Sequence, residues 1–301
     1  MNRLIAFAVF WCAPLFSGEI RVVSLSSPLA ETMYSLGAQN KLVGVSDVCL
    51  FPNQIIADRE SGKIQVVGQF TKPDLKQIDA LHPTLILTST SFQTSLAKAL
   101  RKKGYKVLHF EPRSLDDIFD EIDQIGDAVG KRTEALHLTA KMRQDVSDIS
   151  RKSRELRRVK LYLEINHEGP WTVGSISPLE NLIEAAGGEN IFADHRIGAF
   201  VTTNREIVRR NPDVILSPIW LNAHMGGIDG IIPLAAIFAR PGYAAVRAVQ
   251  NSRVLYYDSA LLKHEGPRQV LAIRKLAYLM HPDVFENPPD TIPWELGRIR
   301  P

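Results

Sequence analysis

The chain has 301 residues, of which 45% are hydrophobic and 23% charged, as is typical of a soluble globular protein with room for two cores. Its 36 basic and 33 acidic residues leave a net charge of only +3. The one basic cluster, at residues 151–160, contains no aromatic residue and has no recognition motif beside it. We interpret it as a solvated helix face and expect no nucleic-acid partner.

The first 18 residues have the pattern of a secretory signal peptide. Arg3 precedes an apolar run at residues 4–16, which is shorter than the ~20 residues of a membrane-spanning helix. Ser17 and Gly18 follow, and we expect cleavage near them. A buried N-terminal strand or helix is the alternative interpretation.

Cys12 raises the question of a lipoprotein, but the preceding Trp11 is too large for a lipid-attachment motif. Removal of the first 18 residues leaves Cys49 as the only cysteine, so no intramolecular disulfide is expected. Because no later stretch is long and apolar enough to cross a membrane, we expect a soluble periplasmic or otherwise extracytoplasmic protein.

Short apolar runs alternate with helical patterns along the rest of the chain, which predicts parallel α/β units. Ser114, followed by Asp116 and Asp117, has the pattern of a helix N-terminus. The expected strands are residues 21–25, 42–45, 84–88, 106–110, 160–165, 213–217 and 253–257.

Residues 131–156 form one continuous amphipathic stripe without Gly or Pro. At 1.5 Å per residue, a helix of this length reaches ~40 Å, about the width of a domain. It lies between the two α/β halves, and a coiled-coil arm is the alternative. The apolar positions of the stripe are Ala135, Leu138, Met142, Val146, Ile149 and Leu156.

The two halves resemble each other in one segment. Residues 78–87 and 207–216 share a helix–Pro–strand pattern at a constant offset of 129, with Pro83 and Pro212 in register. Such junctions also occur in unrelated α/β proteins. A duplicated lobe would place a ligand cleft between the two copies.

Most catalytic and nucleotide-binding motifs are absent, including G-x-G-x-x-G, the P-loop, H-E-x-x-H and G-x-S-x-G. His-Glu-Gly-Pro occurs twice, at residues 167–170 and 264–267, and both copies are predicted to be loops. His167, His264 and Glu265 could bind a metal ion or orient a polar ligand. The alternative is that they are ordinary loop residues.

Several aromatic residues follow predicted strands and could form flat walls around a planar or apolar ligand. An isolated aromatic residue is as often part of the core. The residues concerned are Phe70, Phe92, Trp171, Phe200 and Trp220.

Residues 179–192, which contain Leu-Ile-Glu-Ala-Ala-Gly-Gly-Glu-Asn-Ile-Phe, form the most specific motif of the chain. It occurs together with segments at residues 21–37, 42–45, 240–249, 253–254, 266–268 and 281–285. With these segments the chain resembles the class III periplasmic binding proteins, the helical-backbone receptors for vitamin B12, ferric siderophores and haem.

The resemblance implies two Rossmann-like α/β lobes with parallel sheets, joined by one long α-helix, with a ligand cleft between them and little hinge motion. The expected divisions are a signal peptide at 1–18, an N-terminal lobe at 19–130, the interlobe helix at 131–157, a C-terminal lobe at 158–285 and a tail at 286–301.

The implied function is that of a monomeric substrate-binding protein of an ABC importer. It would capture a metal chelate, either a ferric siderophore or a cobalamin-like corrinoid, and deliver it to the permease, with no catalysis, no cofactor and no metal site of its own. Haem is less favoured, because the tyrosine ligands of haem receptors are missing from the equivalent loops. The alternatives are a receptor for haem or a metal ion, a metal-dependent enzyme using His167, His264 and Glu265, and a sensor module on the same fold.

The resemblance also places residues in the pocket. The B12 receptor has aromatic residues where Phe70 and Phe200 stand, so these two are the leading ligand contacts. The full set of expected contacts, to which the aromatic pattern adds Trp171, is Phe70, Ser91, Phe92, Trp171, Phe200, Trp220, Leu262 and His264.

Docking is where the sequence departs from the family. Family members contact the permease through one glutamate in each lobe, which meets arginines by charge-assisted hydrogen bonds. The matching positions here hold Lys76 and Arg205. Glu206 could serve in the C-terminal lobe after a shift of one residue, and Asp74 or Asp79 could replace the N-terminal carboxylate.

Overall fold

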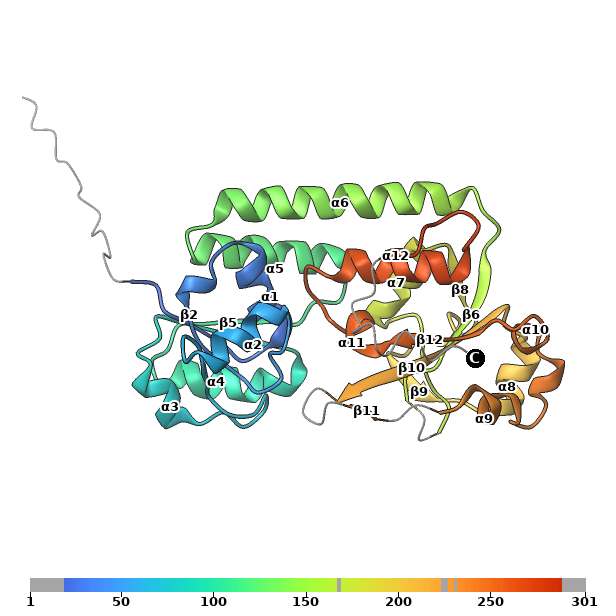
Figure 1. Cartoon of the computed structure of the whole chain (residues 1–301), viewed down its shortest axis with the longest axis horizontal. Helices are drawn as coiled ribbons and strands as arrows, with labels where there is room; N and C mark the ends of the chain where they lie inside the picture. Colours follow the sequence, from blue (N-terminus) through green and yellow to red (C-terminus); the bar gives the residue numbers. More distant parts are fainter. Residues whose placement is uncertain (1–18, 167–168, 223–226, 230–231, 289–301) are drawn as a thin grey trace, which may run out of the picture.

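A computed structural model describes residues 19–166, 169–222, 227–229 and 232–288. Two α/β lobes lie side by side, and helix α6 (Arg132–Arg154) runs along one side of both (Figure 1). The predicted fold of two lobes with parallel sheets, joined by one long helix, is confirmed. Residues 1–18, where the signal peptide is predicted, lie outside the described residues.

The N-terminal lobe is a five-stranded parallel sheet in the order β3-β2-β1-β4-β5, with helices between successive strands. The predicted strand at residues 42–45 is β2. The elements are β1 (Val22–Ser24), α1 (Ser27–Ser35), β2 (Leu42–Val45), α2 (Asn53–Glu60), β3 (Gln65–Val66), α3 (Leu75–Ala80), β4 (Leu85–Ser89), α4 (Thr94–Lys102), β5 (Val107–Phe110) and α5 (Leu115–Ala128).

The C-terminal lobe has a parallel sheet in the order β8-β6-β10-β12. Strand β11 pairs antiparallel with the far end of β10, and β7 and β9 form a separate antiparallel pair. The elements are β6 (Val159–Leu163), β7 (Trp171–Val173), α7 (Pro178–Ala185), β8 (Gly188–Asn190), β9 (Ala199–Val201), α8 (Asn204–Arg210), β10 (Val214–Asn222), β11 (Gly227–Asp229), α9 (Leu234–Phe238), α10 (Arg247–Gln250), β12 (Val254–Asp258), α11 (Ser259–Leu262) and α12 (Gln269–Met280).

The helix–Pro–strand segments recur at equivalent places in the two lobes. Helix α3 leads through Pro83 into β4, and α8 leads through Pro212 into β10. The residues before the prolines, His82 and Asn211, have positive φ angles of 47° and 50°. A positive φ is uncommon for a residue other than glycine. Its occurrence at both junctions supports the interpretation of the lobes as two copies of one unit.

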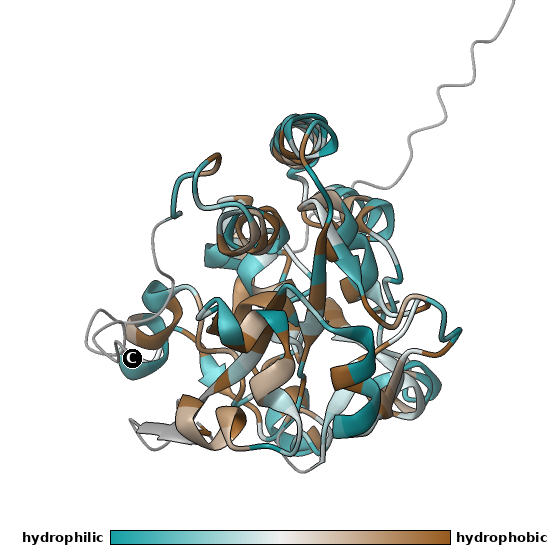
Figure 2. Cartoon of the chain, turned by 90° about the vertical axis from the view of Figure 1, so that its right-hand side faces the viewer, coloured by the Kyte–Doolittle hydropathy of each residue, from teal (hydrophilic) through white to brown (hydrophobic). Residues whose placement is uncertain are grey.

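Helix α6 contacts the cores of both lobes. Ala135 and Met142 are buried in the core of the N-terminal lobe, and Ile149 in that of the C-terminal lobe. Val146 packs against both cores. Figure 2, which looks along the length of the molecule, shows α6 end-on, where it packs on α5 from one lobe and α12 from the other.

None of the helices in the described part of the chain combines the length and apolar character needed to cross a bilayer.

Candidate ligand-binding site

A cavity of about 570 Å³ lies between the two lobes. The N-terminal lobe contributes the segment after β4 and the start of α5, and the C-terminal lobe contributes segments around β7, α7, β9 and α11. The described lining residues are Ser91, Phe92, Ser114, Leu115, Ile118, Ile165, Val173, Ser177, Pro178, Leu179, Leu182, Gly198, Ala199, Leu262, Lys263, Glu265 and Gln269.

The parallel sheets determine where the cavity lies. Residues that directly follow β4, β5, β6 and α11 reach it, so the carboxyl ends of the strands face the space between the lobes. Two helices also begin there. The Oγ of Ser114 accepts a hydrogen bond from the backbone N–H of Asp117 in α5 (3.2 Å), and the Oγ of Ser177 accepts one from Leu179 in α7 (3.3 Å). Each serine keeps its hydroxyl proton available to a ligand.

The rim of the cavity is apolar and open to solvent. Phe92 is 78% exposed on the N-terminal side. On the C-terminal side, Ile176, Ile197 and Val201 are each exposed next to segments that line the cavity. Large apolar side chains left exposed around a hollow are typical of a surface that a ligand covers.

Two charged side chains, Lys263 and Glu265, are among the described lining residues, and both come from the segment between α11 and α12. The Nζ of Lys263 donates to the backbone oxygen of Ile165 (3.3 Å), and loss of hydration lowers the pKa of this lysine to about 8. Burial raises the pKa of Glu265 to about 7. The cavity therefore has one polar corner in a mainly apolar wall.

Gln269 adds buried polar atoms to this corner, and Glu121, which is not among the described lining residues, lies near Glu265. The Nε2 of Gln269 donates to the backbone oxygens of Leu262 (3.2 Å) and His264 (2.7 Å), while its Oε1 is buried without a partner. Glu121, on α5, is 2% exposed, and neither of its carboxyl oxygens has a partner. Burial, with a smaller contribution from the charge of Glu265, raises the pKa of Glu121 well above its usual range.

Three of the expected ligand contacts, Ser91, Phe92 and Leu262, line the cavity. His264 does not: it is 7% exposed, and its Nε2 lies 2.6 Å from Oε2 of Glu31 on α1, in the other lobe. Burial lowers the pKa of His264, although Glu31 acts in the opposite direction. The Nε of Arg268 lies 2.8 Å from the same carboxylate oxygen, so Glu31 forms an ion pair with Arg268 across the lobes and lies beside the imidazole of His264.

The other expected contacts are not among the described lining residues. The ring of Phe200 stacks on that of His195, with centroids 4.7 Å apart, and meets Phe192 edge-on at 5.5 Å. Phe70 and Trp171 are half-buried. Trp220 belongs to β10, but its side chain lies outside the described part, as does His167. A ligand role for these aromatic residues stays a prediction.

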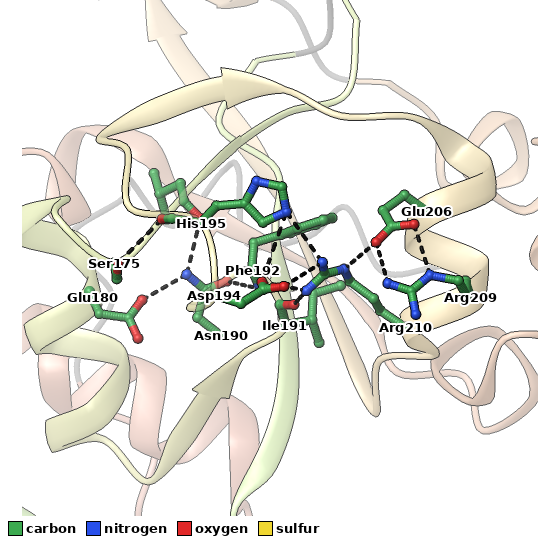
Figure 3. Close-up of polar contacts among 11 residues, drawn as sticks. Ser175, Glu180, Asn190, Ile191, Phe192, Asp194, His195, Glu206, Arg209 and Arg210 are labelled. Carbon is green, nitrogen blue, oxygen red and sulfur yellow. Dashed lines mark hydrogen bonds and ion pairs between the residues drawn. The ribbon is translucent and has the colours of Figure 1, made fainter.

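The expected docking residues lie on α3 and α8, on the side of the molecule away from α6 (Figure 1). Asp74 caps α3 by accepting from the backbone N–H of Lys76 (2.8 Å), and Asp79 is exposed on the same helix. Glu206 is held by Arg209 (2.5 and 2.9 Å) and Arg210 (2.7 Å), as Figure 3 shows. These arginines lower the pKa of Glu206 to about 2.

The sequence interpretation missed Glu31, Arg268, Glu121 and Gln269. A signal for Glu121 was present, because it lies three residues after Ile118 and four before Ile125, on the buried face of α5. A carboxyl group on such a face is unusual and points to a special environment. The partners of Glu31 lie more than 230 residues away in the chain, and no local pattern indicates them.

Within the described residues, no group of three or more His, Cys, Asp or Glu side chains is placed to hold a metal ion. His264 faces Glu31, whereas Glu265 faces the cavity. The described lining residues include no histidine or cysteine. The arrangement suits binding by shape, apolar contact and a few hydrogen bonds.

The model of the family described as periplasmic binding protein matches residues 22–261. An uncharacterized ABC transporter substrate-binding lipoprotein of Bacillus subtilis, YvrC, is 26% identical over 275 residues, which are 89% of this chain and 82% of YvrC. A cobalamin-binding protein of Halobacterium salinarum is 26% identical over 269 residues, covering 87% of this chain and 69% of that protein.

The solved structure of the periplasmic haem-binding protein HutB of Vibrio cholerae superposes with a TM-score of 0.74. It is 21% identical, covers 88% of this chain and 100% of HutB, and shows the shared fold alone. The chain belongs to the periplasmic binding protein family, and the predicted resemblance to its class III members is confirmed.

Proposed function

We propose that this periplasmic binding protein captures a metal chelate, either a corrinoid or a ferric siderophore, between its lobes and delivers it to the permease of an ABC importer. The observation that carries the proposal is the interlobe cavity of about 570 Å³, with its apolar lining and exposed apolar rim. A bulky chelate buries apolar surface on such walls, and a few polar groups fix its orientation.

The similarity to a cobalamin-binding protein along most of this chain supports a corrinoid as the first ligand to test. The proposed role needs no bond-making, and the mainly apolar lining supports binding without catalysis. We therefore propose a receptor that holds its ligand by contact and releases it to the transporter.

The decisive experiment is the visible absorption spectrum and mass spectrum of protein purified from its native host. A co-purifying corrinoid or ferric siderophore is the expected result. Purified protein should also bind added cyanocobalamin or a ferric siderophore in equilibrium dialysis. Protein that carries only zinc and has hydrolytic turnover would overturn the proposal in favour of an enzyme.

Export is part of the proposal, with residues 1–18 as a signal peptide that is removed. N-terminal sequencing of the mature protein tests this, because cleavage near Ser17 or Gly18 would leave a chain that begins with the N-terminal lobe. Recovery of the intact N-terminus from the cytoplasmic fraction would contradict it. We also propose that the mature protein is a monomer, which light scattering measures directly.

Delivery requires a docking surface, for which we propose the exposed ends of α3 and α8. Both helices lie on the side away from α6, so one flat partner could touch both lobes at once (Figure 1). Asp79 and Glu206 are the carboxylates offered there. Because Arg209 and Arg210 already hold Glu206, a permease arginine would have to share or displace them.

A further inference from the structure

The segment between α11 and α12 places unused hydrogen-bond acceptors at one corner of the interlobe cavity. Gln269 is 1% exposed, and its Nε2 is committed to two backbone oxygens. These two bonds fix which way the amide points, and its Oε1 is left buried without a partner. A buried acceptor without a partner is costly and usually indicates a missing group.

Two carboxyl groups, those of Glu265 and Glu121, lie near each other. Glu265 lines the cavity and makes no hydrogen bond or ion pair with another residue in the described part of the chain. Glu121, from α5 of the other lobe, is close enough to Glu265 for their charges to interact, and both of its oxygens are buried without a partner. The carboxyl group of Glu265 and the Oε1 of Gln269 are therefore acceptors at this corner that no described donor reaches.

The cavity has unused donors elsewhere on its wall. Ser114 and Ser177 accept hydrogen bonds from the first turns of α5 and α7, so each hydroxyl proton remains free to point at a ligand. Lys263 is less free, because its ammonium group already donates to Ile165. A ligand that fits must offer N–H or O–H donors to one corner and acceptor oxygens to the helix ends.

We propose that the cavity selects a chelate with carboxamide substituents, whose N–H groups bond to Glu265 and Gln269 and whose carbonyl oxygens accept from Ser114 and Ser177. The carboxamide group supplies a donor and an acceptor together, whereas a carboxylate or an ester supplies acceptors only. This inference rests on the proposed receptor function and adds the chemistry of the ligand's periphery.

The test compares two corrinoids that share one macrocycle. Dicyanocobinamide carries carboxamides, and the heptamethyl ester of dicyanocobyrinic acid carries methyl esters in their place. Equilibrium dialysis followed by the absorbance of the corrin gives the affinity of each. We expect the wild-type protein to bind the amide at least about tenfold more tightly than the ester.

The preference should fall in Glu265→Met and in Gln269→Met, because the amide then loses its acceptors and the ester loses none. Glu265→Met is the cleaner variant, because the Glu265 side chain holds no other described residue in place. Gln269→Met also removes the bonds to Leu262 and His264, so its fold is checked by circular dichroism. Gln144→Met, an exposed position on α6, is the matched control and should keep the full preference.

Equal binding of the two corrinoids, or a preference that survives in both variants, would overturn the inference and leave the receptor function standing. Failure of the wild-type protein to bind either corrinoid would overturn the inference together with the corrinoid as ligand.

Discussion

Glu31 and His264 join the two lobes at their interface, with Oε2 of Glu31 2.6 Å from Nε2 of His264. Arg268 reinforces the contact at 2.8 Å and also lies over the ring of Phe51, 3.7 Å from its centroid. Glu31 and Phe51 belong to the N-terminal lobe, and His264 and Arg268 to the C-terminal lobe. Glu31 is buried, so its removal leaves the charge of Arg268 without compensation.

Replacement of Glu31 by alanine should lower the free energy of unfolding by about 3 kcal/mol, because Arg268 then stays buried without its partner. Urea unfolding followed by circular dichroism measures the change. Asp127→Ala removes a carboxylate from an exposed ion pair with Arg132 and should leave stability nearly unchanged. An equal effect of the two substitutions would show that the interlobe ion pair contributes nothing special.

Glu265 should make stability depend on pH. Burial raises its pKa from 4.5 to about 7, so the folded protein holds this proton more tightly than the unfolded chain does. The contribution of Glu265 to the free energy of unfolding is fully present below pH 4.5 and is lost as the pH rises to about 7. Relative to the wild type, Glu265→Gln should therefore gain stability across this window, on the order of 2 kcal/mol at its upper end.

The groups around Glu265 modify this result without changing its sign. Glu121 faces it from α5 and has a raised pKa for the same reason, so Glu121→Gln should act in the same direction. Lys263 and His264 flank it in the chain. Urea unfolding of the wild type and of Glu265→Gln at several pH values between 4 and 8 measures the free energy of unfolding of each protein. If this free energy changed with pH in the same way in both proteins, the raised pKa of Glu265 would be contradicted.

Phe92 should contribute to affinity and little to stability, because its ring is 78% exposed at the rim of the cavity. Phe92→Ala is expected to weaken binding of cyanocobalamin about tenfold, through lost contact with the face of the ligand. Equilibrium dialysis provides the affinity and thermal unfolding provides the stability. Leu136→Ala, an exposed apolar position on α6, is the matched control, and unchanged affinity in Phe92→Ala would remove this residue from the site.

Charges on α3 and α8 should control docking. If the permease offers arginines, Glu206→Gln should weaken its affinity about fivefold and Lys76→Glu should strengthen it. The measurement is binding of the labelled receptor to the permease in nanodiscs at low salt. Asp148→Asn removes an exposed carboxylate from α6, on the opposite side, and should have no effect. Weaker docking of Lys76→Glu would show that the partner surface is acidic.

Periodic and local features of this protein could be predicted from its sequence. The stripe at residues 131–156 predicted a long helix, and α6 spans Arg132–Arg154. The Ser114 pattern predicted a helix start, and its Oγ caps α5. Both depend on neighbours within a few residues, where side-chain spacing determines the outcome.

Features that depend on distant partners could not be predicted in this way. The short strands β7, β9 and β11 gave no alternating pattern long enough to recognise, because each has three residues and is stabilised by its partner strand. His264 was expected in the pocket, but burial against Glu31 gives it a structural neighbour in the other lobe. Phe200, which was interpreted as a pocket wall, packs on His195 and Phe192, and its contact with a ligand stays a prediction.

Helix α6 should couple the thermal unfolding of the two lobes. Val146 packs against the cores of both lobes. Unfolding of either core therefore exposes apolar surface of Val146 that the other core also buries. Two domains joined by a flexible linker unfold independently. An apolar residue shared by both cores on one continuous helix couples their unfolding transitions. Calorimetry should show one heat-absorption peak for the whole chain, and a ligand bound between the lobes should raise its temperature without splitting it.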